Sequence, residues 1–159
     1  MAFPVPLVTA CSGHALALGI FLAMVGDYAV GAAKPIKKGK EFKIGANEVA
    51  IGLDMPRPAV LVLQNRLSPS LLNRVAVQAE IFTPAAALAA GILDNVCPAD
   101  QLLAVATAKA EQLANLNQAA FLATKLRIRG PIIRVMDKAI DDEDIDFRAR
   151  VRAKTTSKL

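Results

Sequence analysis

The sequence predicts an α/β fold that ends in a helical region, on the strength of three observations. First, short apolar runs at residues 5–11 and 28–30 flank a turn and a longer apolar segment at 15–24, which is the alternation of strand and helix typical of α/β folds. Second, 54% of the 159 residues are hydrophobic but only 4% are aromatic, which favours helical Ala, Leu, Val and Ile packing over a sandwich or barrel. Third, apolar positions recur with near-helical spacing beyond residue 99.

The first strand is expected within residues 5–11, an apolar run that contains a threonine. Ser12-Gly13 then predicts a tight turn. Residues 15–24 have the length and composition of a helix that is buried on most sides. Gly26-Asp27 leads from this helix into the second strand, at residues 28–30.

A lysine-rich segment follows the second strand and contains Pro35 and Gly39. Charge, proline and glycine together predict a solvated loop, which leads into a short strand at residues 42–44. The lysines of this segment are Lys34, Lys37, Lys38, Lys40 and Lys43.

A helix is predicted to begin at Thr83, because threonine is a good N-cap and Pro84 suits the first helical position. Gly91 is expected to end this helix, and residues 92–96 then resume as a strand that finishes before Pro98.

Three further helices are predicted, at residues 99–116, 118–129 and 132–153, with Gly130-Pro131 separating the last two. The last helix carries an acidic run followed by basic residues. We interpret this run as a solvated or subunit-facing surface rather than a metal site, because no histidine or second carboxylate cluster accompanies it. The charged residues are Asp141, Asp142, Glu143, Asp144, Asp146, Arg148, Arg150 and Arg152.

The length suits one domain, or part of a larger one, and composition narrows the classes of protein. The net charge of +5 is modest and the basic residues are not interleaved with aromatics, so an anionic small ligand is favoured over nucleic acid.

Cys11 and Cys97 form no CxxC pair, which argues against a disulfide framework or zinc site. The apolar run 15–25 is interrupted by Gly19 and is shorter than the ~20 residues that span a bilayer. No Lys or Arg precedes Lys34, so a secretory leader is not expected.

The last three residues, Ser157, Lys158 and Leu159, form the tripeptide that the peroxisomal import receptor reads at a free C-terminus. Lys154, Thr155 and Thr156 precede it and give a basic, flexible tail, as a receptor-read peptide needs. The tripeptide therefore predicts a peroxisomal protein, with a coincidental ending as the alternative.

Four segments resemble the enoyl-CoA hydratase/isomerase (crotonase) family, and they occur in the family's order. Residues 6–16 resemble the strand and turn that open its acyl-CoA site, and Asp27-Tyr28 resembles the Asp after its buried helix. Residues 45–53 resemble its Pro/Asn-Glu-x-x-x-Gly segment, and residues 86–98 resemble its Ala-x-x-x-Gly-Leu-Val-Asn-x-Val-x-Pro signature. Because the matches together span residues 4–129, the chain is identified as a member of this family.

The resemblance implies a partial crotonase-like spiral of strand-strand-helix units followed by C-terminal helices. Residues 1–98 would be the C-terminal part of the core, residues 99–153 the helical region, and residues 154–159 the tail with its targeting signal. The family's N-terminal repeats normally precede the segment at Pro4 and supply part of the site, so the chain alone is expected to lack half of it. A truncated, non-catalytic assembly subunit is therefore an alternative to an enzyme, and the family implies a homotrimer or hexamer.

The resemblance also implies the chemistry. In the family a carboxylate removes a proton beside a thioester carbonyl, and backbone N–H groups stabilise the enolate oxygen. Glu48 matches one catalytic glutamate, and Leu18, in the stretch Ala17-Leu18-Gly19, matches the second N–H donor. Phe21 replaces the other glutamate of the hydratases, so it would exclude water. The favoured reaction is isomerisation of 3-enoyl-CoA to 2-enoyl-CoA in fatty-acid oxidation, with enoyl-CoA hydration as the alternative.

Other candidates for the site are weaker. Lys125 and Arg127, like the lysine-rich loop, would contact the phosphates of coenzyme A, with a solvated surface as the alternative. His14, the only histidine, is interpreted as a packing and hydrogen-bonding residue rather than a base. No metal and no cofactor is expected apart from the coenzyme A of the substrate, and neither nucleic acid nor a membrane is an expected partner.

Overall fold

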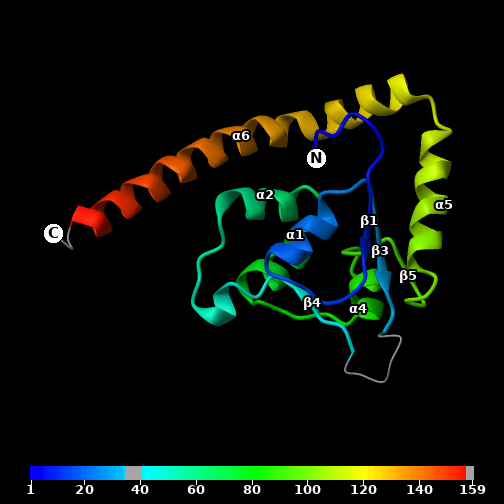
Figure 1. Cartoon of the computed structure of the whole chain (residues 1–159), viewed down its shortest axis with the longest axis horizontal. Helices are drawn as coiled ribbons and strands as arrows, with labels where there is room; N and C mark the ends of the chain where they lie inside the picture. The colour runs from blue at the N-terminus through cyan, green and yellow to red at the C-terminus, as the bar shows by residue number, and fades with distance from the viewer. Residues whose placement is uncertain (35–40, 157–159) are drawn as a thin grey trace.

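The computed structural model describes residues 1–34 and 41–156, with side chains as far as Ile145. A small sheet stands between helix α5 (Leu102–Ala114) on one face and the shorter helices on the other, while the long helix α6 (Gln118–Thr156) crosses one end (Figure 1). This arrangement confirms the predicted α/β fold with C-terminal helices. The proposed targeting residues Ser157, Lys158 and Leu159 lie outside the described residues.

The main sheet contains three parallel strands in the order β1 (Val8–Cys11), β3 (Tyr28–Ala32) and β5 (Asn95–Cys97). Neighbouring residues of the central strand β3 alternate between the two faces, as a strand requires. Ala29 packs into the larger core cluster, and Val30 packs against α5. Both strand predictions before residue 34 are confirmed, with β1 shorter and β3 longer than expected.

The predicted helix at residues 15–24 is wrong over its first three residues. Ala15 and Leu16 form a strand, β2, which pairs in parallel with β4 (Ile44–Gly45), and helix α1 occupies only Leu18–Met24. The Ala15 N–H donates to Lys43 O at 2.9 Å. This pairing with a distant segment overrides the local preference of an apolar run for helix.

Ala17 joins β2 to α1 in an unusual backbone conformation, with φ 49° and ψ −121°. Its N–H donates to Gly45 O at 3.1 Å, and its own carbonyl accepts from the Ile20 N–H at 3.2 Å. Positive φ is costly for a residue with a Cβ, so these bonds hold a strained junction at the start of α1.

Residues 49–77 fold into short helical segments that the sequence analysis did not predict. A 3₁₀ helix, η1 (Val49–Ile51), precedes α2 (Arg57–Gln64), and α3 (Pro69–Leu72) continues into a π-helical segment, η2 (Asn73–Val77). Helix α2 packs against α1 and α6.

Helix α4 (Pro84–Ala89) confirms the predicted start and stop. Thr83 is the N-cap and its Oγ1 accepts from the Ala86 N–H at 3.2 Å, while Gly91 follows the helix at φ 76°. The strand expected at residues 92–96 forms as β5, three residues later than its predicted start.

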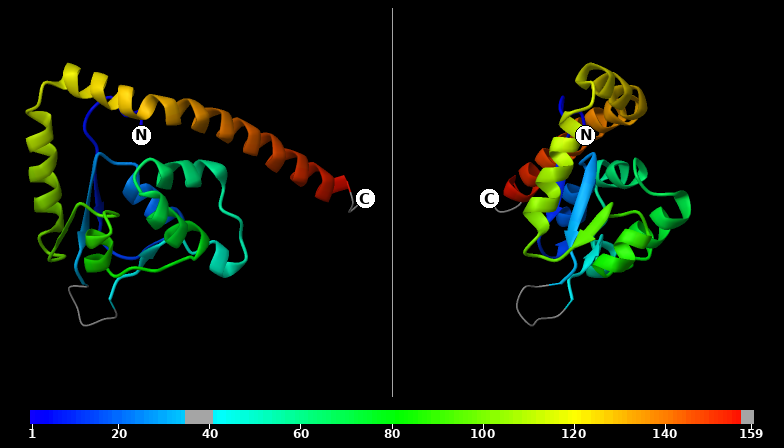
Figure 2. Two further views of the ribbon diagram at one scale, coloured as in Figure 1. Left: turned by 180° about the vertical axis from the view of Figure 1, so that it is seen from behind. Right: turned by 90° about the vertical axis from the view of Figure 1, so that its right-hand side faces the viewer.

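The predicted break at Gly130-Pro131 is wrong, because α6 runs through both residues as one helix (Figure 2). Pro131 lacks the N–H that would bond the carbonyl of Arg127. Arg127 and Pro131 are exposed, so water is available to that carbonyl and the helix can continue.

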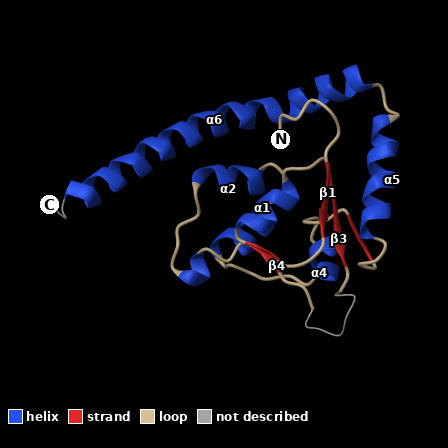
Figure 3. Ribbon diagram, in the orientation of Figure 1, coloured by secondary structure: helices blue, strands red, loops and turns tan. Residues whose placement is uncertain are grey.

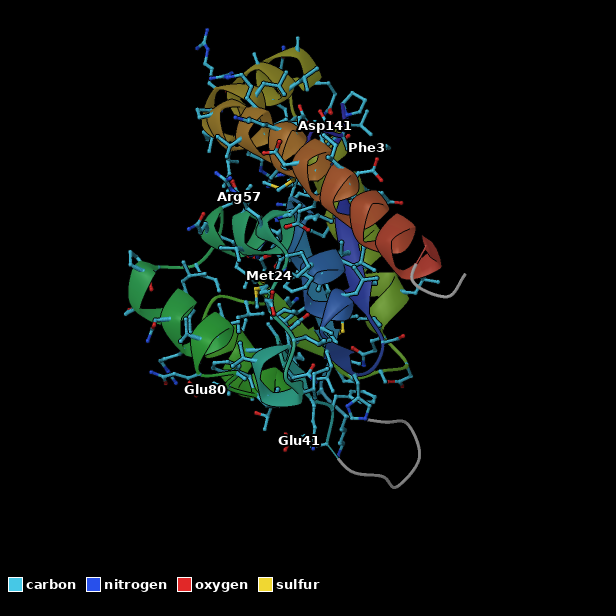
Figure 4. All side chains as sticks on the ribbon, turned by 90° about the vertical axis from the view of Figure 1, so that its left-hand side faces the viewer. Phe3, Met24, Glu41, Arg57, Glu80 and Asp141 are labelled. Carbon is cyan, nitrogen blue, oxygen red and sulfur yellow. The ribbon has the colours of Figure 1, made fainter. Side chains whose placement is uncertain are left out.

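The core lies mainly on the side of the sheet away from α5. The shorter helices lie on that side of the sheet (Figure 3). Met24 is 1% exposed inside this core, whereas Glu80 lies near the surface (Figure 4). Among the described helices, none combines the length and the apolar character that crossing a bilayer demands.

Candidate active site

An apolar cavity of about 610 Å³ lies among α1, η1, α2 and α6. Two carboxylates, Glu48 and Asp54, are the only charged side chains among the lining residues that the structure describes. Several apolar side chains at the cavity are well exposed, which is unusual for a surface without a ligand. The other lining residues are Ala17, Leu18, Phe21, Leu22, Val25, Ile51, Leu53, Pro56, Pro58, Ala59, Val62 and Met136.

Glu48 precedes η1 and its side chain is turned into the protein. The residue is only 6% exposed, and its Oε2 is buried without a hydrogen-bond partner in the described part of the chain. Its backbone is fixed, because its carbonyl accepts from the N–H groups of Ile51 and Leu53, both at 3.0 Å. A buried carboxylate oxygen without a partner is costly in a purely structural role, so it requires a functional explanation.

Leu18 is the first residue of α1, so its backbone N–H has no partner within the helix. The residue is 66% exposed and lines the same cavity as Glu48. The structure therefore brings an available N–H donor and a buried carboxylate to one cavity.

Phe21 lies three residues after Leu18 on α1 and is 8% exposed. Its ring lines the cavity too, where it supplies an apolar wall rather than a proton acceptor. The three residues that the sequence analysis assigned to the reaction thus border one cavity.

Lys125 and Arg127 do not line this cavity. The Lys125 Nζ is buried and lies 2.7 Å from Asp27 Oδ2, so its charge already has a partner inside the chain. Arg127 is exposed on α6. A role for either residue in binding coenzyme A stays a prediction, and the contacts of Lys125 also give it a structural role in the described chain.

His14 has the hydrogen-bonding role that the sequence analysis gave it. Its Nδ1 accepts from the Lys43 N–H at 2.9 Å, and its ring meets Phe42 edge-on at 5.6 Å between centroids. Of the lysine-rich loop, Lys34 and Lys43 are exposed, and residues 35–40 lie outside the description.

The acidic run of α6 includes one residue with a clear structural partner, because Glu143 accepts from the Arg57 N–H. Asp141 and Asp142 are exposed, as expected for a solvated surface. Within the part of the chain that the structure describes, no three His, Cys, Asp or Glu residues are grouped so that they could hold a metal ion.

Asp54 and Met136 are among the lining residues that sequence reasoning did not assign to the site. Asp54 follows Glu48 by six residues and comes directly after the segment 45–53 that was already singled out, so its proximity could have been inferred. Met136 is far away in the sequence, and no local pattern distinguishes it from other apolar residues of α6.

An α/β fold with a buried, unpaired carboxylate beside an apolar cavity and a free N–H suits proton transfer next to a carbonyl. The chain belongs to the enoyl-CoA hydratase/isomerase family, whose model matches residues 1–156. The family consists of enzymes that act on enoyl-CoA thioesters, and its fold accounts for the strand and helix order seen here.

The relatives include both hydratases and an isomerase. The chain is 29% identical over 127 residues to the probable enoyl-CoA hydratase EchA17 of Mycobacterium tuberculosis, covering 80% of this chain and 46% of that protein. It is 30% identical over 123 residues to human mitochondrial enoyl-CoA delta isomerase 1, covering 77% and 39%. The solved structure of the enoyl-CoA hydratase EchA3 from Mycobacterium ulcerans superposes with a TM-score of 0.83 at 40% identity, covering 92% of this chain and 61% of that one.

The chain thus spans less than half the length of these two curated relatives. Because hydratases and an isomerase both occur among them, the family assignment leaves the particular reaction open.

Proposed function

We propose that this protein isomerises 3-enoyl-CoA to 2-enoyl-CoA. The Glu48 carboxylate takes a proton from carbon 2 of the substrate and returns it at carbon 4, while the double bond moves from carbons 3 and 4 to carbons 2 and 3. One carboxylate suffices for this transfer, and no metal or further cofactor takes part. The observation that carries the proposal is the buried Glu48 Oε2, which has no described partner and belongs to a residue of the largely apolar cavity.

The remaining residues have supporting roles. The Leu18 N–H donates to the enolate oxygen that forms when the proton leaves carbon 2. The Phe21 ring keeps water away from that enolate, so that the proton returns to carbon instead of being lost. In the family's hydratases the position of Phe21 is expected to carry a second glutamate, which a phenyl ring cannot replace.

Hydration of 2-enoyl-CoA is the second candidate, and Asp54 is the observation that favours it. Asp54 is an exposed carboxylate that borders the same cavity, and a second carboxylate is the group that would orient a water molecule for hydration. A third possibility is a truncated, non-catalytic assembly subunit. For the protein in its cell, we propose a peroxisomal location read from Ser157, Lys158 and Leu159, and assembly into a trimer or hexamer.

Because this chain spans less than half the length of its curated relatives, the test measures both reactions on a purified protein that also carries the N-terminal repeats of the family. Isomerisation is followed by the appearance of the conjugated 2-enoyl thioester, and hydration by the 3-hydroxyacyl product. We expect isomerisation to exceed hydration, and Glu48→Gln to lower isomerisation by about 100-fold or more because the amide cannot accept the proton. Glu41→Gln, on an exposed glutamate outside the cavity, is the matched control.

A further variant separates the two reactions. Phe21→Glu should raise hydration relative to isomerisation, because it restores a second carboxylate beside Glu48. Equal rates of both reactions in the unsubstituted protein would contradict the role of Phe21. Full activity of Glu48→Gln would remove Glu48 from the mechanism, and absence of both activities would favour the non-catalytic assembly subunit.

A further inference from the structure

One side chain of α6, Met136, reaches the cavity that holds Glu48. It is the only contribution of α6 to the described lining, and it packs, half-buried, against the main core cluster. A thioether side chain is flexible and apolar, so it suits contact with the end of an alkyl chain.

The position of Met136 is fixed by two contacts further along the same helix. Ala139 is 1% exposed, so α6 lies close to the core at this residue. Glu143 Oε1 accepts from the Arg57 N–H at 2.6 Å, which satisfies a free donor at the start of α2. Met136, Ala139 and Glu143 are three and four residues apart, so they share one face of α6. Figure 4 shows Arg57 on α2 beneath the ribbon of α6.

The cavity follows the length of α1. Leu18 at the start of the helix and Val25 just after its end both line the cavity, and the helical rise separates them by about 10 Å. A thioester placed at the Leu18 N–H would therefore direct its acyl chain along α1. Helix α6 crosses the molecule at the far end of α1 (Figure 1), where Arg129 Nη2 donates to Gly26 O at 3.2 Å. Met136 lies seven residues further along α6 and belongs to the lining of the cavity.

The charge of the lining defines which chains fit. Glu48 and Asp54 are both acidic, and no Lys, Arg or His belongs to the described lining. An acyl chain that ends in a second carboxylate would lose its hydration there without a cationic partner among the described lining residues. An uncharged alkyl chain instead buries its methylenes against Phe21, Val62 and their neighbours.

We propose that the cavity selects acyl thioesters with an uncharged alkyl chain, and that Met136 marks the far end of that chain. This inference rests on the proposed function, because it places the thioester beside Glu48 and Leu18. It adds a substrate class and a residue that determines chain length.

The experiment measures the dissociation constants of saturated, straight-chain acyl-CoAs of increasing length, which bind without turnover. Affinity should rise about fourfold for each added methylene until the chain reaches Met136, and then stay constant. Met136→Ala should move this plateau to longer chains, and Met136→Phe should move it to shorter ones. Ile140→Ala, on an exposed residue one turn along α6, is the matched control and should leave the plateau unchanged.

If Met136 limits the length of the bound acyl chain, its two variants shift the plateau in opposite directions. If Met136 only supports the fold, its substitution weakens the binding of all chains alike. An acyl-CoA with a terminal carboxylate should bind at least about tenfold more weakly than the alkyl chain of equal length. A plateau that neither variant moves, or equal affinity for the carboxylate-ended chain, would overturn the inference while leaving the proposed reaction intact.

A second measurement avoids dependence on how the Ala and Phe variants fold. The protein is labelled at its methionine methyl groups and studied by NMR, and the Met136 signal is identified by its loss in the volume-conserving variant Met136→Leu. This signal should shift when long acyl chains bind and not when short ones bind. A signal that no chain shifts, in a protein that binds acyl-CoA, would overturn the inference. Failure to bind any acyl-CoA would instead contradict the proposed function and remove the basis for both.

Discussion

A buried ion cluster ties α6 to the start of the sheet, and its removal should destabilise the fold strongly. Asp27 Oδ2 lies 2.7 Å from Lys125 Nζ, and Asp27 Oδ1 lies 3.0 Å from Arg129 Nη1. The side chains of Asp27, Lys125 and Arg129 are 9%, 5% and 14% exposed. Asp27 Oδ2 also accepts from the Leu7 N–H at 2.8 Å, so one carboxylate joins α6 to the segment before β1.

We predict that Asp27→Asn lowers the free energy of unfolding by about 3–5 kcal/mol, because it leaves the buried Lys125 ammonium without a counter-charge. The amide keeps an acceptor for Leu7, so the loss reports on the charges rather than on that hydrogen bond. For a chain of this size the loss corresponds to a decrease in Tm of about 6–20 °C.

The measurement is urea unfolding followed by circular dichroism, with a second probe to verify a two-state transition. Glu80→Gln is the control, because the Arg74–Glu80 pair is an exposed ion pair and its removal should change stability little. A loss below about 1 kcal/mol for Asp27→Asn would refute the reasoning, since it would mean that water compensates Lys125 in the folded protein.

Three other predictions test packing, capping and targeting. Gly45→Ala should cost about 1–3 kcal/mol in urea unfolding, because its Cβ would meet Glu80 O and Ile81 Cδ1 at 2.8 Å, whereas Gly13→Ala, with its nearest neighbour at 3.9 Å, should cost little; equal losses would contradict the packing argument. Glu143→Ala should cost about 1 kcal/mol by exposing the Arg57 donor of α2, and the same stability as in Asp142→Ala would show that the cap is ineffective. Deleting residues 157–159 should move a fluorescently tagged protein from peroxisomes to the cytosol without changing its Tm, and continued import would disprove the signal.

Local signals predicted elements well, and pairing between distant segments was the main source of error. Thr83, Pro84 and Gly91 act within a few residues of themselves, so the helix between them was predicted correctly. Ala15 was assigned to a helix because its apolar neighbours suit one, but it pairs with a strand that begins at Ile44. Nothing near Ala15 in the sequence specifies that partner.

The break predicted at Pro131 had a different cause. Proline removes one hydrogen bond of a helix, but its cost depends on whether the freed carbonyl reaches water, and exposure is a property of the fold. The short helices of residues 49–77 went unpredicted, although Ser68 followed by Pro69 is the same start signal as Thr83 followed by Pro84.

The candidate site was predictable as a set of residues but not as an environment. Glu48, Leu18 and Phe21 were chosen from motifs, and the structure brings all three to one cavity. The isolation of the Glu48 carboxylate and the contribution of Met136 both depend on how η1 and α6 pack, which no motif encodes.

At the strained junction before α1, the stability of the fold and the orientation of the Leu18 donor favour different residues at position 17. An alanine at φ 49° raises the energy of the folded chain, and a glycine there would relieve the strain. The bonds to Gly45 O and from the Ile20 N–H nevertheless hold the alanine in place, directly before the Leu18 donor. A glycine would gain thermal stability but give the junction more conformational freedom, so the donor would be less well oriented. A substitution at position 17 that raises thermal stability would therefore be expected to lower the rate of turnover.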